Sequence, residues 1–215
     1  FRIGLFGRNM GAGLLTDSGG LFAEFRRCVD VVLLQRFRCV HADRLSVRFD
    51  EGADVRLRQH IERPLIDRLQ YGRVADHPAL PAAFYQLTAQ AEGRGVYSFC
   101  MCPGGWVVPA STEPEGLCTN GMSLKRRDSP LANAALVVSV EPADVAAFGR
   151  GPGDPLAGIA FQRAVEHAAY VAGGSGFVAP AQRLADFLRG RPSTDVLRST
   201  YRPRIVPGDV GALLP

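Results

Sequence analysis

The most reactive side chains of this 215-residue chain are five cysteines, and two of them lie one residue apart. Cys100 and Cys102 belong to the stretch SFCMCPGGWVVPAS, in which a Pro-Gly-Gly turn follows directly. Such a stretch suits a metal site, a redox pair or a tight turn that faces a cofactor. In a strand the two thiols would lie side by side on one face. Their expected structural role is that of small buried hydrophobic groups.

A zinc site would need four ligands at characteristic spacings. Cys100, Cys102 and Cys118 supply three sulfurs, and His77 is the nearest histidine. A disulfide between residues 100 and 102 would close a small, strained ring. We therefore predict no metal site here. The odd cysteine count, the irregular spacing and the lack of an export signal predict reduced thiols in a cytoplasm.

Glycines and asparagines supply the other candidate ligand-binding positions. The early glycines are not spaced as G-x-G-x-x-G and no strand is expected before them, so they predict a loop. Asn120-Gly121 is a turn signal, and its amide is also a candidate contact for the polar edge of a ligand. The sequence lacks the motifs of serine nucleophiles and zinc proteases, so the residues alone identify no catalytic nucleophile.

Composition limits the classes of partner. The net charge is +4, and the basic residues are spread along the chain. The one basic run, Lys125-Arg126-Arg127, is followed at once by Asp128, which is typical of a solvated loop or an anion contact rather than a nucleic-acid surface. No stretch approaches about 18 uninterrupted apolar residues. We predict neither a nucleic-acid nor a membrane partner.

The chain divides into two unlike parts. Residues 1–60 follow no clean strand or helix period and form an unassigned segment, whereas residues 61–215 indicate ordered elements. The expected strands are Val31–Leu34, Leu45–Phe49, Val96–Met101, Trp106–Ala110 and Ala134–Val140. The Pro-Gly-Gly turn would join the third and fourth of these as a hairpin.

Two helices are expected after the last strand. Asp154 is a natural N-cap, and Gly173-Gly174 would end the first helix. Pro180 would open the second, at Ala181–Arg189. This order of elements predicts an α+β fold, with an antiparallel sheet and helices packed on one side of it.

Several blocks of the second part resemble one protein family. The blocks occur in order as LIDRLQYG (65–72), YSFCMCPGG (97–105), TNGMS (119–123), NAALVVSV (133–140), PLAGIAFQR (155–163) and APAQRLADFLRGRPST (179–194). Together they resemble the middle-to-late region of the uncharacterised FAD-dependent dehydrogenases, which are large bacterial flavoproteins. The resemblance covers about residues 61–215 and implies the substrate-side part of a split Rossmann-type flavoprotein, with a partial return towards the FAD domain.

The resemblance also implies a cofactor, a reaction and a site. The full-length enzyme would transfer a hydride between a small-molecule substrate and FAD, with NAD(P)H as a candidate electron donor or acceptor. The backbone of the turn would approach the flavin or the substrate and stabilise negative charge. The residues expected to line the site are Cys100, Cys102, Pro103, Gly104, Gly105, Asn120, Gly121 and Arg127.

Three departures from the family pattern qualify this expectation. The G-x-G-x-x-G unit and the late glycine-rich FAD segment are missing from the sequence, and residues 1–60 do not resemble the corresponding region. We therefore expect a fragment, inactive by itself, whose residues 1–60 stem from a shifted reading frame. The alternative is a non-catalytic, truncated binding domain that lacks flavin.

Overall fold

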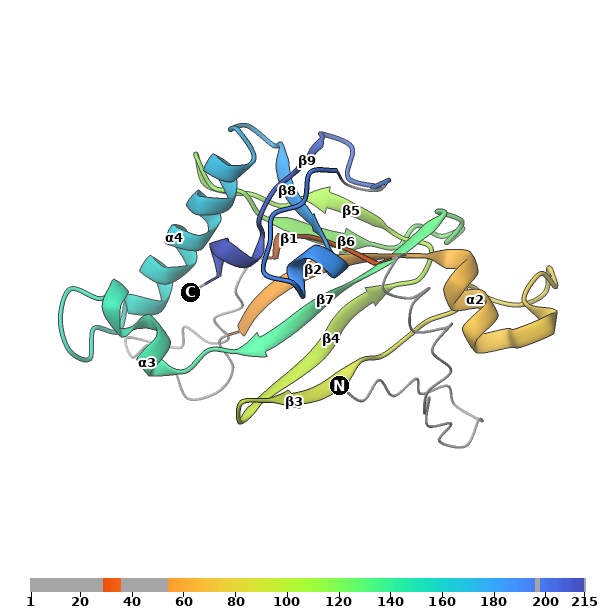
Figure 1. Ribbon diagram of the computed structural model, residues 1–215, viewed down its shortest axis with the longest axis horizontal. Coiled ribbons are helices and arrows are strands. Elements are labelled where there is room, and N and C mark those ends of the chain that lie inside the picture. The colour runs from red at the N-terminus through yellow and green to blue at the C-terminus, as the bar shows by residue number, and fades with distance from the viewer. Residues whose placement is uncertain (1–28, 36–53, 196–197, 215) are drawn as a thin grey trace.

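Strands carry most of the architecture in the computed structural model, which describes residues 29–35, 54–195 and 198–214. Within these residues nine strands form one sheet in the order β3-β4-β7-β2-β1-β6-β5, with β8 beside β1 and β9 beside β8 (Figure 1). Neighbouring strands run antiparallel except at β8–β9 and at the single residue pair that joins β1 to β6. The strands are β1 (Val29–Gln35), β2 (Asp54–Glu62), β3 (Thr88–Ala91), β4 (Arg94–Cys102), β5 (Trp106–Pro109), β6 (Thr119–Met122), β7 (Leu131–Ser139), β8 (Ala179–Arg183) and β9 (Ile205–Pro207).

Few helices accompany this sheet. The longest are α4 (Ala157–Ala172) and α2 (Arg63–Tyr71), which lie at opposite ends of the molecule in Figure 1. The shorter helical segments are α3 (Pro142–Val145), α5 (Leu184–Phe187), η1 (Gly72–Val74), η2 (Ala146–Phe148) and η3 (Gly211–Leu213). The predicted mixture of helices with an antiparallel sheet is thus confirmed.

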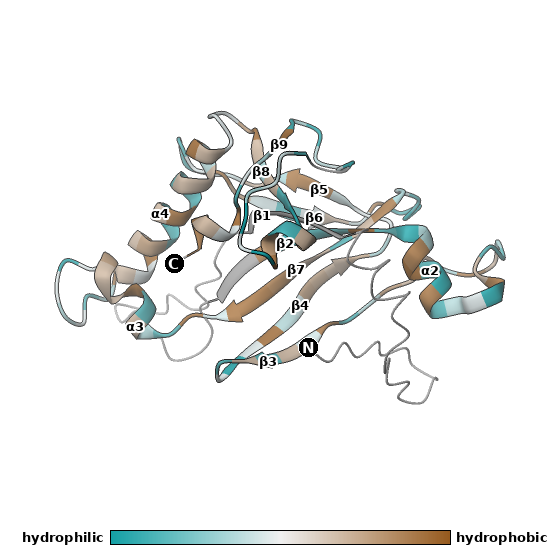
Figure 2. Cartoon of the chain, viewed as in Figure 1, coloured by the Kyte–Doolittle hydropathy of each residue, from teal (hydrophilic) through white to brown (hydrophobic). Residues whose placement is uncertain are grey.

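The central strands β2 and β7 pair over their full length, from Asp54 opposite Ser139 to Glu62 opposite Leu131. β7 is rich in small and β-branched residues, which favour a buried strand, and it is brown along its apolar stretches in Figure 2. The strand expected at 31–34 is found within β1, and the one expected at 134–140 overlaps β7, which ends one residue earlier, at Ser139. The strand expected at 45–49 lies outside the described residues.

The predicted hairpin at the Pro-Gly-Gly turn is wrong. β4 pairs with β3 and β7, whereas β5 pairs with β6. One extra residue interrupts β4 between Phe99, opposite Ala135, and Cys102, opposite Asn133. Such a bulge bends the strand, and the backbone of Cys100 there has a φ of 49°. Distant pairing with β7 therefore overrides the local turn signal.

The two helix predictions had different outcomes. Asp154 accepts hydrogen bonds from the backbone N–H groups of Arg150 and Leu156, at 2.8 and 2.9 Å, just before α4 begins. The backbone N–H of Gly173 closes the other end by donating to Ala169. The second predicted helix is wrong, because residues 179–183 form β8 and only residues 184–187 are helical. Pairing with β1 and β9 overrides the local helix signal of Pro180.

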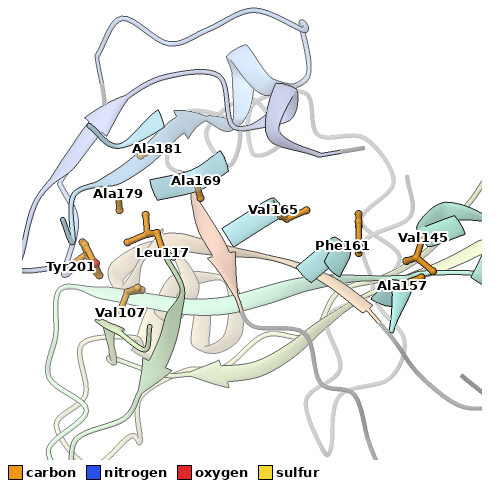
Figure 3. Close-up of a cluster of buried hydrophobic side chains, with 10 residues drawn as sticks. All are labelled: Val107, Leu117, Val145, Ala157, Phe161, Val165, Ala169, Ala179, Ala181 and Tyr201. Carbon is orange, nitrogen blue, oxygen red and sulfur yellow. The ribbon is translucent and has the colours of Figure 1, made fainter. Parts of the chain in front are cut away.

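Two main apolar clusters hold the helices to the sheet. The first, here called the helix core, packs α4 against residues of β5 and β8 (Figure 3). Its buried members are Val107, Leu117, Val145, Ala157, Phe161, Val165, Ala169, Ala179, Ala181 and Tyr201. The second joins α2 to the central strands, through Leu65, Ile66, Ile61, Ala132 and Ala134 together with Ala83 and Tyr85.

Candidate functional site

The fold brings the eight predicted site residues together from three segments. The turn at 103–105 contacts the loop before β7, because the backbone N–H of Ser129 donates to the Gly104 carbonyl oxygen at 3.2 Å. The same turn contacts β6, since the Cα of Gly105 lies against the carbonyl of Met122. Cys100 and Cys102 precede this turn at the end of β4, and Asn120 and Gly121 lie in β6.

Arg58 of β2 connects these segments from inside the protein. Its side chain is fully buried, and its Nη1 donates to the Cys100 carbonyl oxygen at 2.9 Å and to Asn133 Oδ1 at 3.1 Å. Its Nη2 donates to Asn120 Oδ1 at 3.3 Å. The guanidinium thereby joins β2 to β4, β6 and β7. We call Arg58, Cys100, Asn120, Gly121 and Asn133 the arginine cluster.

The glycines of the site have packing roles that explain their identity. A methyl group added at Gly121 would lie 2.6 Å from Arg58 Cζ and 2.5 Å from Asn133 Oδ1. At Gly104, where φ is 50°, a methyl group would lie 1.8 Å from the Arg127 carbonyl oxygen. At Gly104 the obstacle is backbone, so glycine is required there. At Gly121 a side chain would have to displace the Arg58 guanidinium and the Asn133 amide.

The two cysteines of the turn occupy different environments, contrary to the expectation of two buried thiols side by side. The bulge leaves Cys100 exposed, whereas Cys102 is 4% exposed and its Sγ donates to the Cys100 carbonyl oxygen at 3.4 Å. Burial raises the pKa of the Cys102 thiol, and the positive charge of Arg58 lowers it by less. Cys100, Cys102 and Cys118 are all free thiols.

Two buried side chains that respond to the charge of Arg58 are themselves neutral. His60 is buried on β2 with its Nε2 3.0 Å from Ser199 Oγ, and desolvation lowers its pKa to about 4. Desolvation raises the pKa of Tyr85, which is buried in the second apolar cluster. Both side chains are therefore uncharged at neutral pH.

Arg127 stands apart from the buried cluster. It is exposed and lines a cavity of about 640 Å³ between α2 and the loop at residues 126–130. Arg63 and Asp67 of α2 form an ion pair at 3.1 Å in the wall of this cavity, and Arg63 Nη1 also donates to the Arg127 carbonyl oxygen at 3.3 Å. The volume is in the range of small-molecule sites.

Sequence reasoning missed Arg58 because it lies within the segment set apart at residues 1–60. One signal could have found it. Arg58 and His60 are polar residues two apart in DVRLRQHIE, and residues at this spacing share a face of a strand. The apolar Leu57 and Ile61 lie on the opposite face of this strand. A polar face of this kind indicates either a buried polar cluster or a solvated face.

The described residues contain no group of three metal-ligating side chains. In that same part of the chain, every helix is too short or too polar to cross a bilayer. The fold and the site thus define a domain built on a mostly antiparallel sheet, with a buried arginine beneath a Cys-Pro-Gly-Gly turn.

Comparison with known proteins assigns this domain to a family. A family model described as "FAD-dependent protein, C-terminal domain-like" matches residues 53–215, and the chain belongs to that family. A protein of Clostridium beijerinckii, described only as uncharacterized, is 50% identical over 138 residues, or 62% of this chain. The chain covers 25% of that relative's length.

The family match begins at residue 53, ahead of the predicted boundary at residue 61, and β2 continues across that boundary. Arg58 therefore belongs to the matched domain. The division of the chain at residue 60 and the shifted reading frame before it stay predictions.

Proposed function

We propose that this chain is the substrate-side domain of an FAD-dependent oxidoreductase whose full-length form transfers a hydride between a small molecule and the flavin. Family membership supports the link to FAD. The arginine cluster carries the proposal further, because Arg58 fixes the Cys100 end of β4 to Asn120 of β6 through partly buried hydrogen bonds. Two motifs distant in sequence thus form one rigid surface, as a cofactor or substrate site requires.

The described residues fit contacts to a flavin ring or substrate rather than to the whole cofactor. The Cα atoms of Gly104, Gly105 and Gly121 are covered by the protein's own atoms, so these glycines offer no cradle for a pyrophosphate. Cys100 and Asn120 are exposed beside them. We assign ring-side and substrate-side contacts to this domain and phosphate contacts to another part of the full-length protein.

Bound FAD would supply the hydride acceptor or donor. The residues of this chain would orient the substrate and exclude water at Cys100, Pro103 and Asn120, while Arg127 would anchor an anionic group at the cavity it lines. The Gly105 N–H already donates to the Cys102 carbonyl oxygen at 3.2 Å. This bond makes Gly105 a poor candidate for stabilising charge on a ligand.

The test uses the full-length protein that contains this domain. Absorbance in the flavin bands after purification reports bound FAD, and rapid mixing with NADH or NADPH gives the rate of flavin reduction. Replacing Asn120 with Ala, or Cys100 with Ser, should perturb the flavin spectrum and slow its reduction about tenfold. Thr112→Ala, at an exposed position outside the site, should change neither.

Two results would count against the proposal. Full-length protein without flavin would favour the alternative, a non-catalytic binding domain. Bound flavin with an unchanged spectrum and an unchanged reduction rate in both site variants would remove this surface from the active site.

A further inference from the structure

Arg58 carries a positive charge into the interior without an anionic partner among the described residues. The guanidinium donates to neutral oxygens, those of Cys100, Asn120 and Asn133. Its Nε is buried without a hydrogen-bond partner there, as is Nδ2 of Asn133. Arginine side chains are cationic in proteins, and burying a cation without a counter-charge is strongly unfavourable.

The surrounding titratable groups do not supply the missing charge. The nearby side chains whose pKa responds to Arg58 are His60, Tyr85 and Cys102. Burial keeps each of them neutral, because it lowers the pKa of His60 and raises those of Tyr85 and Cys102. The positive potential of Arg58 is therefore not cancelled by these groups.

This charge lies just below an accessible surface. The guanidinium packs directly against the Cα of Gly121, where any side chain would displace it. Gly121 is half-buried, and its neighbours Asn120 and Cys100 are exposed. Asn120 Oδ1 accepts from both Arg58 Nη2 and the Gly121 N–H, at 3.3 and 2.8 Å. The amide therefore directs its donor end, Nδ2, away from the guanidinium.

We propose that the surface formed by Cys100, Asn120 and Gly121 above Arg58 binds an anionic group, whose charge complements the buried guanidinium. The inference rests on the proposed function, because the anion would be either a carboxylate of the substrate or the negatively charged ring of the cofactor. Arg58 acts as a positioning residue in both cases. It holds the Asn120 amide by its oxygen and supplies the attractive potential.

The experiment compares two site variants with wild type in the full-length protein. Arg58→Met removes the charge and keeps much of the side-chain volume. Asn120→Asp keeps Arg58 and places a neutralising carboxylate beside it. Arg150→Met, an exposed arginine in the loop between α3 and α4, is the matched control for loss of one positive charge.

Two measurements distinguish the two sources of the anion. The first is the rise in melting temperature on adding acetate, which reports carboxylate binding whether or not flavin is present. The second is the flavin midpoint potential without acetate. For a substrate carboxylate, both site variants should bind acetate about tenfold more weakly with an unchanged potential. If the anion is the cofactor ring, both site variants should have a more negative flavin midpoint potential. The reason is that the positive charge of Arg58 stabilises the anionic reduced flavin, and each variant removes or neutralises that charge.

The outcomes are separable from those of the proposed function. Folded site variants with wild-type acetate binding and wild-type potential would overturn the anion site, even in a working flavoenzyme. Full-length wild type without flavin would defeat the proposed function, while the acetate measurement would still decide the anion site. If Arg58→Met does not fold, Asn120→Asp decides alone.

Discussion

The helix core and the arginine cluster are two interior regions of the same domain with opposite chemistry. In the helix core, apolar side chains such as Phe161 and Val165 pack without directional bonds, and Phe161 meets Phe148 edge to face at 5.0 Å. In the arginine cluster, the Arg58 guanidinium donates three directed hydrogen bonds to oxygen atoms on three other strands. The helix core is buried throughout, whereas the arginine cluster buries Arg58 and Asn133 and leaves Cys100 and Asn120 exposed.

The difference teaches what each region contributes. Apolar burial stabilises in proportion to area and tolerates small changes of geometry. A buried guanidinium pays a desolvation penalty and yields precise placement of its acceptors. We infer that the helix core supplies stability and that the arginine cluster supplies the geometry of the proposed site.

The largest expected effect is the loss of stability on truncating the helix core. Phe161→Ala should lower the free energy of unfolding by about 4 kcal/mol, because Phe161 is only 1% exposed. Ile159→Ala on the same helix is the control, since Ile159 is 38% exposed and should cost far less. Urea unfolding followed by circular dichroism measures both. Equal losses would contradict the assignment of stability to this core.

The same contrast explains what could be predicted from sequence. β7 was predictable because its apolar, β-branched run needs no knowledge of its partners. The end of α4 was predictable from Gly173, because helix termination is a local property. The apolar residues Leu156 and Ile159 are exposed all the same, because the buried face of α4 is formed by Ala157, Phe161, Val165 and Ala169.

The candidate site was predictable only in part. The motifs around Cys100 and Asn120 were found through their resemblance to a family, but the residue that joins them was not. Arg58 is linked to Asn133 across 75 positions and to Cys100 across 42, and no local pattern reports such pairings. The strand at 179–183 was missed for the same reason, because β1 and β9 select it.

The second prediction separates packing from ligand contact at the turn. Gly104→Ala should destabilise by about 3 kcal/mol, because the added methyl meets the Arg127 carbonyl and the backbone has a positive φ. Gly93→Ala is the matched control, since Gly93 has a φ of 80° and open space around it. It should cost about 1 kcal/mol.

Thermal unfolding of Gly104→Ala and Gly93→Ala measures the two losses of stability. Equal costs would show that the turn can move away from the loop before β7. Larger substitutions such as Gly104→Val would disturb folding first, so a loss of flavin reduction in that variant would not by itself locate the site.

The third prediction concerns pH and the polar interior. The pKa of His60 is lowered from 6.5 to about 4, so protonation favours the unfolded chain between these values. The contribution of neutral His60 to the free energy of unfolding should be fully present above pH 6.5. It should fall by up to about 3 kcal/mol as the pH decreases towards 4. His60→Gln should remove this part of the slope. A stability profile unchanged by the substitution would mean that the histidine is not buried as a neutral group.

The smallest effect is expected at a polar contact outside both regions. Arg94 of β4 and Asp144 of α3 form a two-pronged ion pair, with Nη2 and Oδ1 2.8 Å apart, and their hydrogen bonding lowers the pKa of Asp144. A carboxyl with a lowered pKa stabilises the fold above its unfolded value and loses that contribution as the pH falls through the folded value. Asp144→Asn should therefore lower the melting temperature slightly at pH 7, and by less as the pH falls through the folded pKa of Asp144.

This pair is partly exposed, with side-chain exposures of 35% and 27%, so water and salt screen the attraction. Added salt should reduce the difference between Asp144→Asn and wild type at pH 7. It should not reduce the cost of Phe161→Ala, because apolar burial carries no charge. A salt-resistant effect of Asp144→Asn would instead assign its loss to the hydrogen bond that Asp144 accepts from the Glu141 N–H at 2.7 Å, which helps to begin α3.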